Sequence, residues 1–369
     1  MKYKAIESAK GAWQNATEKG AEMSKVRNLL IFFMIIVLTC GIALSGCAPK
    51  LAPQVIEWKM QCIYPPADSA YSIQATGLVK CLNEGTNGRL HVTLYPPGAL
   101  CPEGEMFDAI SKGLFDAAVH SASASKGIVP EANMVLGLPA SFENNEQFIE
   151  FFYDYGGLDL LREAYAEHNI LFLMPGASGE FALMTTFPLR SLDDIKGKKL
   201  WLSGMFSDVL QSLGASPVTI PAGELYMAMK LGTIDGATWT LPELETAKWK
   251  EVVHTVMLPY LLSPVGFEVL VNMDSWNALP ADLKQTVENI AKEYAPVTAN
   301  DISKLGVDAC AAAKDYGVNF ITLSDADQKI LREAAKKMAW DKFATKSERC
   351  SRIVKLLEDY LKSKGVPLP

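Results

Sequence analysis

The chain has 369 residues, of which 49% are hydrophobic and 21% charged, and its formal net charge is −7. This length is sufficient for two domains of ordinary size. The acidic balance argues against a nucleic-acid partner, because phosphate contacts need a basic face. Removal of residues 1–46, which hold six basic and three acidic side chains, would make the net charge −10.

The first element along the chain is an apolar run over residues 29–43, preceded by Lys25 and Arg27. A basic segment followed by such a run and by small residues is typical of an export signal. The run leads into Leu44-Ser-Gly-Cys47, which resembles a lipobox, where the signal is cut before the cysteine and the thiol carries lipid. We therefore predict a tail, signal and lipobox over residues 1–47, with Cys47 lipidated. The remainder of the chain is then exported and tethered by lipid to the outside of a bacterial cell membrane or in the periplasm.

The alternative for the same run is a transmembrane anchor, because its length is near the lower limit for a span. Both interpretations place the remainder of the chain outside the cytoplasm. No later apolar run is long enough to cross a membrane.

Strands and helices alternate after a short tether. Alternation of apolar residues predicts a strand over 55–63, and a helical pattern follows it. This part of the chain has five further expected elements: a helix at about 69–83, a strand at 88–95, a helix at about 104–112, a strand at 115–120 and mostly helix over 146–167. Such alternation indicates an α/β layered fold.

The second half continues this alternation. Two apolar strands are expected at 170–174 and 181–185, separated by a turn at Gly176–Gly179. Six further elements follow: a strand at 199–202, a helix at 207–213, a strand at 217–219, a helix at 224–231, and strands at 236–240 and 265–271. From Asp282 onward the chain is expected to be mainly helical, and no internal repeat is evident.

The cysteines beyond the signal give no metal-binding pattern. Cys62, Cys81, Cys101, Cys310 and Cys350 form neither a Cys-x-x-Cys motif nor a cluster with histidine, so no metal site is predicted. An exported chain can form disulfides. The odd number leaves at least one thiol, and buried thiols are the simpler interpretation.

Five segments, in order from about residue 88 to residue 280, resemble one family. They are Gly88-Arg-Leu with Tyr95-Pro-Pro-Gly-Ala-Leu100, Asp108 to Asp116, Leu192 to Leu200, Leu213 to Gly236, and Val271-Asn272 with Trp276 and Leu279-Pro280. Each match is weak alone, but the ordered set is similar to the solute receptors of tripartite ATP-independent periplasmic (TRAP) transporters.

This resemblance implies a two-lobed periplasmic binding protein fold of the α/β class, with a hinge and an interlobe ligand cleft. The first lobe would comprise residues 55–175 and about 241–275. The second lobe would comprise 176–240 and about 276–369. The implied function is the capture of a small organic solute and its delivery to TRAP membrane subunits, with no enzymatic activity and no cofactor.

Two other functions remain open on the sequence. One is an exported enzyme, and the other is a receptor on the same fold that senses or scaffolds without transport. Against an enzyme, the chain lacks a Gly-x-Ser-x-Gly elbow, a His-Glu-x-x-His motif and a phosphate loop.

The chain departs from the family at its ligand-binding positions. Most members bind a carboxylate with an arginine, whose planar guanidinium gives two hydrogen bonds, and this position aligns with Trp201. A second arginine of some members aligns roughly with Phe181. Members that bind oxo-acids through a metal often have Glu-Trp where this chain has Thr238-Trp239. Neither the carboxylate clamp nor that metal site is therefore predicted.

Three aromatic side chains would instead line the cleft, and aromatic walls suit a ring, an apolar tail or a cation. The alternative for each of them is packing in the core between strand and helix. Glu180 is a polar candidate that could pair with a cationic ligand, or it could be a solvated turn residue. Further polar candidates are Tyr64, on the loop after the first strand, and His120 and Ser121, at the end of a later strand. The predicted ligand-binding residues are Trp201, Trp239, Phe181, Tyr64, His120, Ser121 and Glu180.

Overall fold

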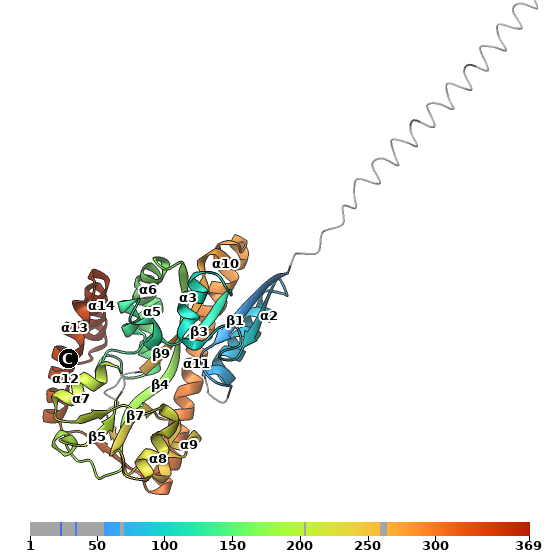
Figure 1. The fold of residues 1–369 in the computed structure, drawn as a ribbon. Helices are drawn as coiled ribbons and strands as arrows, with labels where there is room; N and C mark the ends of the chain where they lie inside the picture. The colour runs from blue at the N-terminus through green and yellow to red at the C-terminus, as the bar shows by residue number, and fades with distance from the viewer. Residues whose placement is uncertain (1–22, 24–33, 35–54, 67–69, 203, 259–263) are drawn as a thin grey trace, which may run out of the picture. The chain divides into compact units, whose positions relative to one another are not determined.

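The computed structural model describes residues 23, 34, 55–66, 70–202, 204–258 and 264–369 (Figure 1). The predicted export signal and the lipobox with Cys47 lie outside these residues, apart from Met23 and Met34. Residues 55–369 form one unit. Among the residues described, no helix combines the length and the apolar character that crossing a membrane requires.

One group of strands is built around β1 (Ile56–Cys62). β1 lies between β2 (Leu90–Tyr95) and β3 (Ala117–His120), and both pairings are parallel. β3 pairs antiparallel with β9 (Pro264–Asn272), which pairs antiparallel with β4 (Ile170–Thr185). Met60, Leu90 and Val119 are buried in this group, so alternate positions of short apolar strands supply its core.

The second group of strands uses the far end of β4. There β4 pairs antiparallel with β7 (Gly236–Thr240), and β7 pairs parallel with β5 (Lys199–Trp201). β6 (Ser216–Val218) continues the sheet beside β5. β8 (Thr255–Leu258) also pairs with the end of β4 and is parallel to β10 (Asn319–Thr322). β4 and β9 therefore connect the two groups of strands.

Strand β4 is continuous over 16 residues, so the predicted turn at Gly176–Gly179 is wrong. Gly176 pairs with Phe267 and Ala177 pairs with Gly266 across the β4–β9 ladder. A Cβ added at Gly176 would lie 2.0 Å from the Phe267 ring, and one added at Gly266 would lie 2.6 Å from the Gly176 carbonyl oxygen. These glycines allow close packing within the sheet, because a strand glycine lets another backbone or side chain approach closely.

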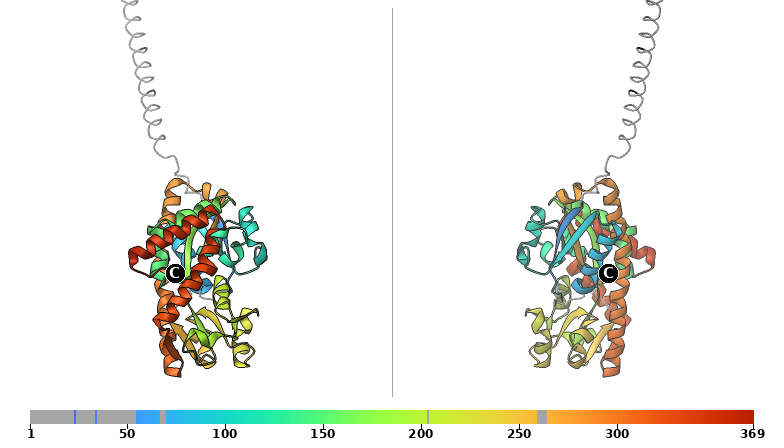
Figure 2. Two further views of the ribbon diagram at one scale, coloured as in Figure 1. Left: turned by 90° about the vertical axis from the view of Figure 1, so that its left-hand side faces the viewer. Right: turned by 90° about the vertical axis from the view of Figure 1, so that its right-hand side faces the viewer.

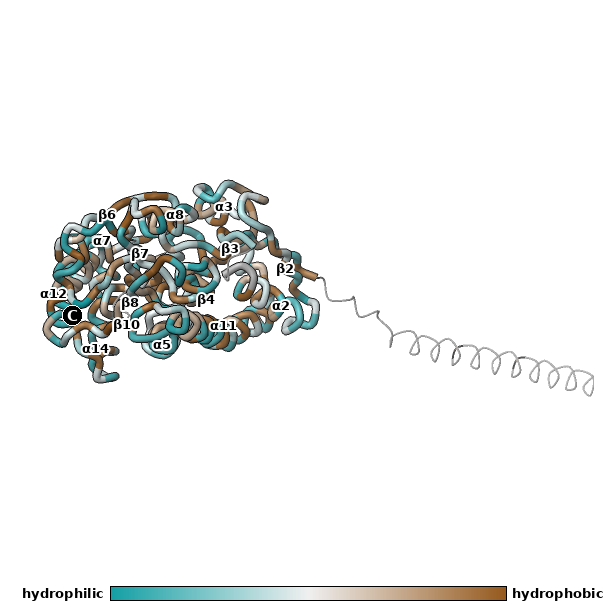
Figure 3. The backbone as a smooth tube through the Cα atoms, turned by 90° about the horizontal axis from the view of Figure 1, so that it is seen from below, coloured by the Kyte–Doolittle hydropathy of each residue, from teal (hydrophilic) through white to brown (hydrophobic). Residues whose placement is uncertain are grey.

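Helices cover the strands on their outer faces (Figures 1 and 2). The longest helix among the described residues, α11 (Ala281–Tyr316), packs against β4, α2, α5 and α9. Its residues alternate between hydrophobic and hydrophilic (Figure 3), as expected for a helix with one buried face. The other helices are α2 (Thr76–Gly85), α3 (Met106–Ser111), α4 (Ala122–Ser125), α5 (Asn145–Asp154), α6 (Gly157–Ala166), α7 (Met205–Ser212), α8 (Leu225–Lys230), α9 (Glu243–Thr246), α10 (Met273–Asn277), α12 (Asp325–Ala335), α13 (Asp341–Ala344) and α14 (Glu348–Lys364).

Side-chain caps fix the starts of α4, α5, α10, α12 and α14. Asn144, Ser324 and Ser347 precede α5, α12 and α14, and each side chain accepts a hydrogen bond from a backbone N–H of the first turn. Gly317 and Gly365 end α11 and α14 in the left-handed conformation, which glycine adopts without steric cost. Local sequence therefore determines where these helices begin and end.

The predicted strands up to residue 120 and those at 199–202, 217–219, 236–240 and 265–271 are confirmed within a few residues, as are the predicted helices. The short strands β8 and β10 were not predicted. β8 falls in the range predicted for the first lobe, yet it pairs with the end of β4, which falls in the range predicted for the second. Conversely, α14 falls in the range predicted for the second lobe but packs against α6, which falls in that of the first. The lobe boundaries themselves stay a prediction.

The structure contains one local arrangement twice, although no repeat was expected. Residues 102–120 run through α3 into β3, and residues 221–239 run through α8 into β7. In both copies the strand pairs in parallel with an earlier strand, β1 or β5. The two segments share Pro, Gly, Glu, Ala, Gly, Asp and Ala at equivalent positions: Pro102 and Pro221, Gly104 and Gly223, Glu105 and Glu224, Ala109 and Ala228, Gly113 and Gly232, Asp116 and Asp235, Ala118 and Ala237.

The shared aspartate has the same role in each copy. Asp116 Oδ2 accepts a hydrogen bond from the backbone N–H of Lys59 at 2.8 Å, and Asp235 Oδ2 accepts one from Lys199 at 2.7 Å. Each carboxylate thus joins the loop before one strand to the neighbouring strand. This equivalence is clear in the structure, whereas the few identities are hard to recognise in the sequence.

The described cysteines are mostly buried. Cys81, Cys101 and Cys350 are free thiols, and Cys62 and Cys310 are buried. Burial raises the pKa of the Cys350 thiol to about 11, so this thiol is protonated at neutral pH.

Candidate functional site

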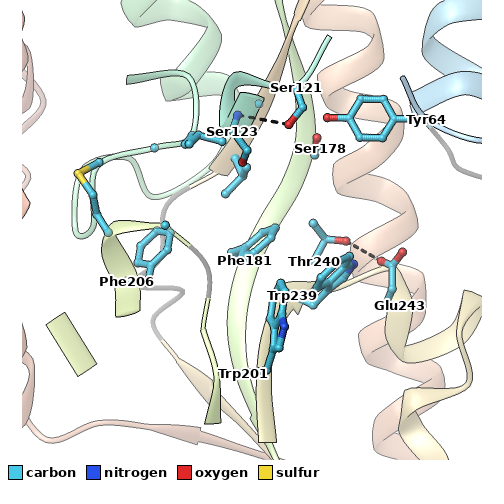
Figure 4. A pocket seen from close by; sticks show the side chains of 16 residues that line it. Tyr64, Ser121, Ser123, Ser178, Phe181, Trp201, Phe206, Trp239, Thr240 and Glu243 are labelled. Carbon is cyan, nitrogen blue, oxygen red and sulfur yellow. Dashed lines mark hydrogen bonds between the residues drawn. The ribbon is translucent and has the colours of Figure 1, made fainter. Parts of the chain in front are cut away.

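A cavity of about 220 Å³ lies where β4 changes its partner from β9 to β7. Its lining comes from both groups of strands and from the loops that follow them (Figure 4). The lining residues are Tyr64, Ser121, Ser123, Leu136, Gly137, Ser178, Phe181, Trp201, Gly204, Met205, Phe206, Trp239, Thr240, Glu243, Val265 and Gly266. A concave, largely apolar space with a few polar groups is the usual form of a small-molecule site.

Three aromatic rings form one wall of this cavity. Phe181, Trp239 and Trp201 stand on the adjacent strands β4, β7 and β5. The Trp201 and Trp239 ring centroids are 5.1 Å apart at 45°, and those of Phe181 and Trp239 are 6.3 Å apart at 27°. The rings therefore support one another and present a continuous aromatic surface to the cavity.

The Trp201 ring is held in place through its indole nitrogen. Trp201 Nε1 donates a hydrogen bond to the Ile220 carbonyl oxygen at 3.0 Å. Gln61 occupies the position on β1, beside the first copy, that Trp201 occupies on β5, beside the second. Its Nε2 donates a hydrogen bond to the Cys101 carbonyl oxygen at 2.9 Å. Trp201 thus fastens the loop before α8 as Gln61 fastens the loop before α3, and its N–H is engaged with the backbone.

Hydroxyl groups line the opposite side of the cavity (Figure 4). Ser121 caps α4, and its Oγ accepts a hydrogen bond from the Ser123 backbone N–H at 3.3 Å. The side chains of Ser123, Ser178 and Tyr64 lie nearby. These groups can donate and accept hydrogen bonds, so they suit a ligand with neutral polar substituents.

Two side chains among the described lining residues can ionise: the Glu243 carboxyl and the Tyr64 phenol. The Thr240 hydroxyl donates a hydrogen bond to Glu243 Oε2 at 2.6 Å, which orients the carboxylate (Figure 4). No lysine, arginine or histidine occurs in the described lining. Among the described lining residues, the ionisable side chains are therefore a carboxyl and a phenol rather than basic groups.

His120 does not line the cavity but lies in a buried hydrogen-bonded network below it. Its Nδ1 is 3.0 Å from Ser125 Oγ and 3.2 Å from Glu268 Oε2, and Ser125 Oγ donates to the same carboxylate oxygen at 2.6 Å. The Tyr165 hydroxyl donates to the other oxygen of Glu268. Burial, with the adjacent Glu268 carboxylate, raises the pKa of Tyr165 well above its usual range.

This network has the residue types of a hydrolase triad but not its geometry. Ser125 and Glu268 both meet Nδ1 of His120, whereas a triad uses the two ring nitrogens for different partners. All three side chains are buried, so no substrate could reach the serine. The network instead fixes α4, which carries Ser121 and Ser123 to the cavity.

Glu180 is also directed away from the cavity. It is 8% exposed, and its Oε1 accepts a hydrogen bond from the Ser303 hydroxyl of α11 at 3.0 Å. Arg190 is exposed and does not line the cavity either. The structure thus brings together five of the seven predicted residues: Tyr64, Ser121, Phe181, Trp201 and Trp239.

Several lining residues were not predicted from the sequence. Two of them are Glu243, which carries a carboxyl group, and Thr240, which hydrogen-bonds to that group. Thr240 could have been found through the duplicated segment, because it follows Trp239 as Ser121 follows His120. Glu243 begins a four-residue helix and carries no sequence signal of its own. Ligand contacts by any of these residues stay a prediction.

The described residues do not fit a resident metal. Thr238, in place of the glutamate of the metal-dependent pattern, is buried, and its hydroxyl has no hydrogen-bond partner within the described part of the chain. No group of three or more His, Cys, Asp or Glu side chains is arranged to hold a metal ion among the residues described. No binding step is therefore assigned to a metal.

The fold and the cavity define a periplasmic binding protein of the α/β class, with two groups of strands joined by crossing strands. Residues 63–347 match the family of bacterial extracellular solute-binding proteins, family 7, and the chain belongs to this family. It is an extracytoplasmic solute-binding receptor of the TRAP type, which confirms the predicted fold class and function.

Curated relatives agree with this assignment over most of their length. The chain is 25% identical over 333 residues to a monocarboxylate 2-oxoacid-binding periplasmic protein of Nostoc, covering 88% of this chain and 90% of the relative. It is 26% identical over 281 residues to a C4-dicarboxylate-binding periplasmic protein of Rhodobacter capsulatus, covering 75% and 83%.

Solved structures of TRAP periplasmic solute-binding proteins share the fold of this chain. A TRAP periplasmic solute-binding protein of Rhodobacter sphaeroides in an apo open form has a TM-score of 0.73 at 25% identity, covering 84% of this chain and 99% of that one. One from Chromohalobacter salexigens with bound (S)-(+)-2-amino-1-propanol has a TM-score of 0.69 at 24% identity, covering 84% and 96%.

Proposed function

We propose that the protein captures a small organic solute in the cavity beside β4 and delivers it, chemically unchanged, to TRAP membrane subunits. The observation that carries this proposal is the origin of the lining. Tyr64 and Ser121 come from the first group of strands, and Trp201 and Trp239 come from the second. A solute that touches both groups stabilises the closed arrangement of a hinged protein.

The solute should present an apolar, aromatic or cationic surface. The aromatic wall supplies area for such a surface, and the described lining supplies no cation for a carboxylate. A carboxylate that entered this cavity would lose its water without gaining a full countercharge, which is costly. Simple dicarboxylates such as succinate and malate are therefore expected to bind poorly, even though relatives are named for such ligands.

Calorimetry and small-angle scattering test this function together. A panel of dicarboxylates, 2-oxo acids, aromatic acids, amines and amino alcohols is titrated into the protein, and each bound solute is recovered and identified. We expect binding of at least one solute with an apolar or cationic surface, compaction on binding, and recovery of the same molecule. A converted product would move the protein to the enzymes, and tight dicarboxylate binding unaffected by Trp201→Ala would refute the role given to the aromatic wall.

We also propose that the mature protein is held at the membrane by lipid on Cys47. The support is the Leu44-Ser-Gly-Cys47 sequence directly after the apolar run. A tethered receptor stays near the membrane subunits to which it delivers solute, because the tether raises its effective concentration there.

A further inference from the structure

The aromatic wall of the cavity offers ring faces to a solute. Phe181, Trp239 and Trp201 stand on the adjacent strands β4, β7 and β5, with neighbouring ring centroids 6.3 and 5.1 Å apart. The indole N–H of Trp201 donates to the Ile220 carbonyl oxygen, so the polar edge of this ring is engaged within the protein. A row of supported faces is complementary to a flat ring, because aromatic pairs gain from stacking beyond the area that they bury.

The volume of the cavity limits the size of that ring. An apolar cavity of about 150 Å³ is sufficient to bind benzene. The cavity beside β4 has a volume of about 220 Å³. It can therefore hold a ring larger than benzene, such as a fused pair of rings with a short substituent.

The side of the cavity opposite this wall carries hydroxyl groups that are available to a solute (Figure 4). The side-chain hydroxyls of Ser123 and Ser178 line the cavity and make no hydrogen bond to any residue that the structure describes. A serine hydroxyl can both donate and accept a hydrogen bond. The two serines thus match a neutral hydroxyl or carbonyl group on the solute.

The same two hydroxyls do not suit a charged substituent. An ammonium or carboxylate group that left water for neutral hydroxyls alone would lose much of its solvation, which is costly. Lysine, arginine and histidine are absent from the lining that the structure describes. The Glu243 carboxylate lies on the side of Trp239 and accepts the Thr240 hydroxyl, so a substituent that reaches the serines points away from it.

We propose that the solute is an uncharged aromatic compound whose ring stacks on Trp239, between Phe181 and Trp201, and whose hydroxyl or carbonyl substituent bonds to Ser123 and Ser178. This inference rests on the proposed function and names its substrate class. The aromatic wall selects a flat ring, and the two serines fix the orientation of that ring in the cavity.

Five probes separate the ring from its substituent. Indole-3-ethanol, tryptamine and indole-3-acetate share one ring and carry a neutral, a cationic and an anionic group, 3-ethylindole lacks the hydroxyl, and 2-cyclohexylethanol lacks the aromatic face. Each is titrated calorimetrically into the full-length protein. We expect indole-3-ethanol to bind about tenfold or more tightly than the two charged indoles, about fivefold more tightly than 2-cyclohexylethanol, and about threefold more tightly than 3-ethylindole.

Two variants assign these differences to residues. Trp239→Leu keeps an apolar side chain without a ring face, and it should weaken indole-3-ethanol by about fivefold or more while changing 2-cyclohexylethanol by less than about twofold. The double variant Ser123→Ala with Ser178→Ala should weaken indole-3-ethanol by about threefold or more and leave 3-ethylindole within about twofold. The Ser123 backbone N–H that donates to Ser121 is retained in this variant.

Tyr316→Leu is the matched control for the loss of an aromatic ring. Tyr316 is 59% exposed at the end of α11 and does not line the cavity. This variant should bind all five probes as the parent does, and circular dichroism verifies that every variant is folded.

Several results would overturn the inference. They are equal or tighter binding of any of the other four probes than of indole-3-ethanol, unchanged indole-3-ethanol binding in Trp239→Leu or in the double serine variant, and absence of binding by all the indoles. The proposed function is judged separately, by compaction with any solute, those of the wider panel included. A charged or non-aromatic solute that compacts the protein would therefore refute the aromatic compound and leave the receptor function intact.

Discussion

Replacement of Gly176 by alanine tests whether the crossing of β4 and β9 is packed as tightly as the structure shows. Gly176 lies within β4 opposite Phe267. An alanine Cβ would lie 2.0 to 2.4 Å from three atoms of the Phe267 ring, against an optimal contact of roughly 3.5–4.0 Å. Phe267 is 2% exposed, so its ring cannot move into solvent.

The expected cost follows from two opposing terms. Insertion of a methyl group into a packed core costs about 1–3 kcal/mol, and the upper end applies here because three ring atoms overlap the new carbon. Alanine also removes the extra chain entropy of glycine in the unfolded state, which restores about 0.5–1 kcal/mol. The free energy of unfolding should therefore fall by about 2 kcal/mol.

The displaced ring should also affect the cavity. Phe267 contacts Tyr64 edge-on, with the ring centroids 6.0 Å apart, and Tyr64 lines the cavity. Gly176→Ala should thus weaken solute binding as well as stability. Urea unfolding followed by tryptophan fluorescence and circular dichroism measures the first effect, and calorimetry measures the second.

Gly223→Ala is the matched control, because a Cβ at Gly223 meets nothing within 4 Å. This variant should be unchanged or more stable by up to about 1 kcal/mol, from the entropy term alone. Equal stability of the two variants, or a Gly176→Ala protein as stable as the unmodified one, would refute the close packing of β4 on β9.

Three further predictions concern other parts of the chain. Trp201→Gln should retain a hydrogen bond to the Ile220 carbonyl oxygen, because Gln61 makes the corresponding bond to the Cys101 carbonyl oxygen. In urea unfolding it should be about 1 kcal/mol more stable than Trp201→Ala. Both variants lose the aromatic surface and should bind solute weakly. The hydrogen bond from Lys364 lowers the pKa of Glu150. This pair therefore stabilises the fold above the unfolded pKa of Glu, about 4.3, and the stabilisation is lost as pH falls through the lower folded pKa. Lys364→Met should destabilise the protein at pH 7, and the difference from the parent in unfolding measurements should shrink progressively as the pH falls below about 4.3. Cys47→Ser should abolish lipid labelling and cleavage of the signal, and intact-mass analysis showing an unmodified Cys47 in the membrane-extracted parent protein would contradict the lipid anchor.

The strands were predictable where burial follows a local pattern. β1 and β2 alternate clearly, and β3 and β9 are short apolar runs between turn residues. β4 was divided in the prediction because Gly176 and Gly179 are usual turn residues. Gly176 packs on Phe267, and Gly179, with φ +109°, lies beside Ile302 at an irregularity of the β4–β9 ladder. Phe267 and Ile302 are distant in sequence and close only in the fold. No local pattern contains that information.

The cavity could be predicted in part for a related reason. Phe181, Trp201 and Trp239 were identified because the family resemblance fixed their positions on strands whose ends meet at the cavity. His120 and Glu180 each precede a lining residue by one position, but the partners that fix their direction come from distant parts of the sequence. Accordingly, His120 meets Glu268 and Glu180 meets Ser303, away from the cavity.

The duplicated segment explains how the two sides of the cavity differ while the fold around them is alike. The strand ends at His120, followed by Ser121, in one copy and in Trp239–Thr240 in the other. The loop before the helix is fastened by Gln61 in the first copy and by Trp201 in the second, through the same kind of hydrogen bond. Because the indole can make this bond from its edge, its face remains available to the cavity. The second copy thereby gains an aromatic surface without losing the contact that positions its loop, and the first copy keeps a polar one.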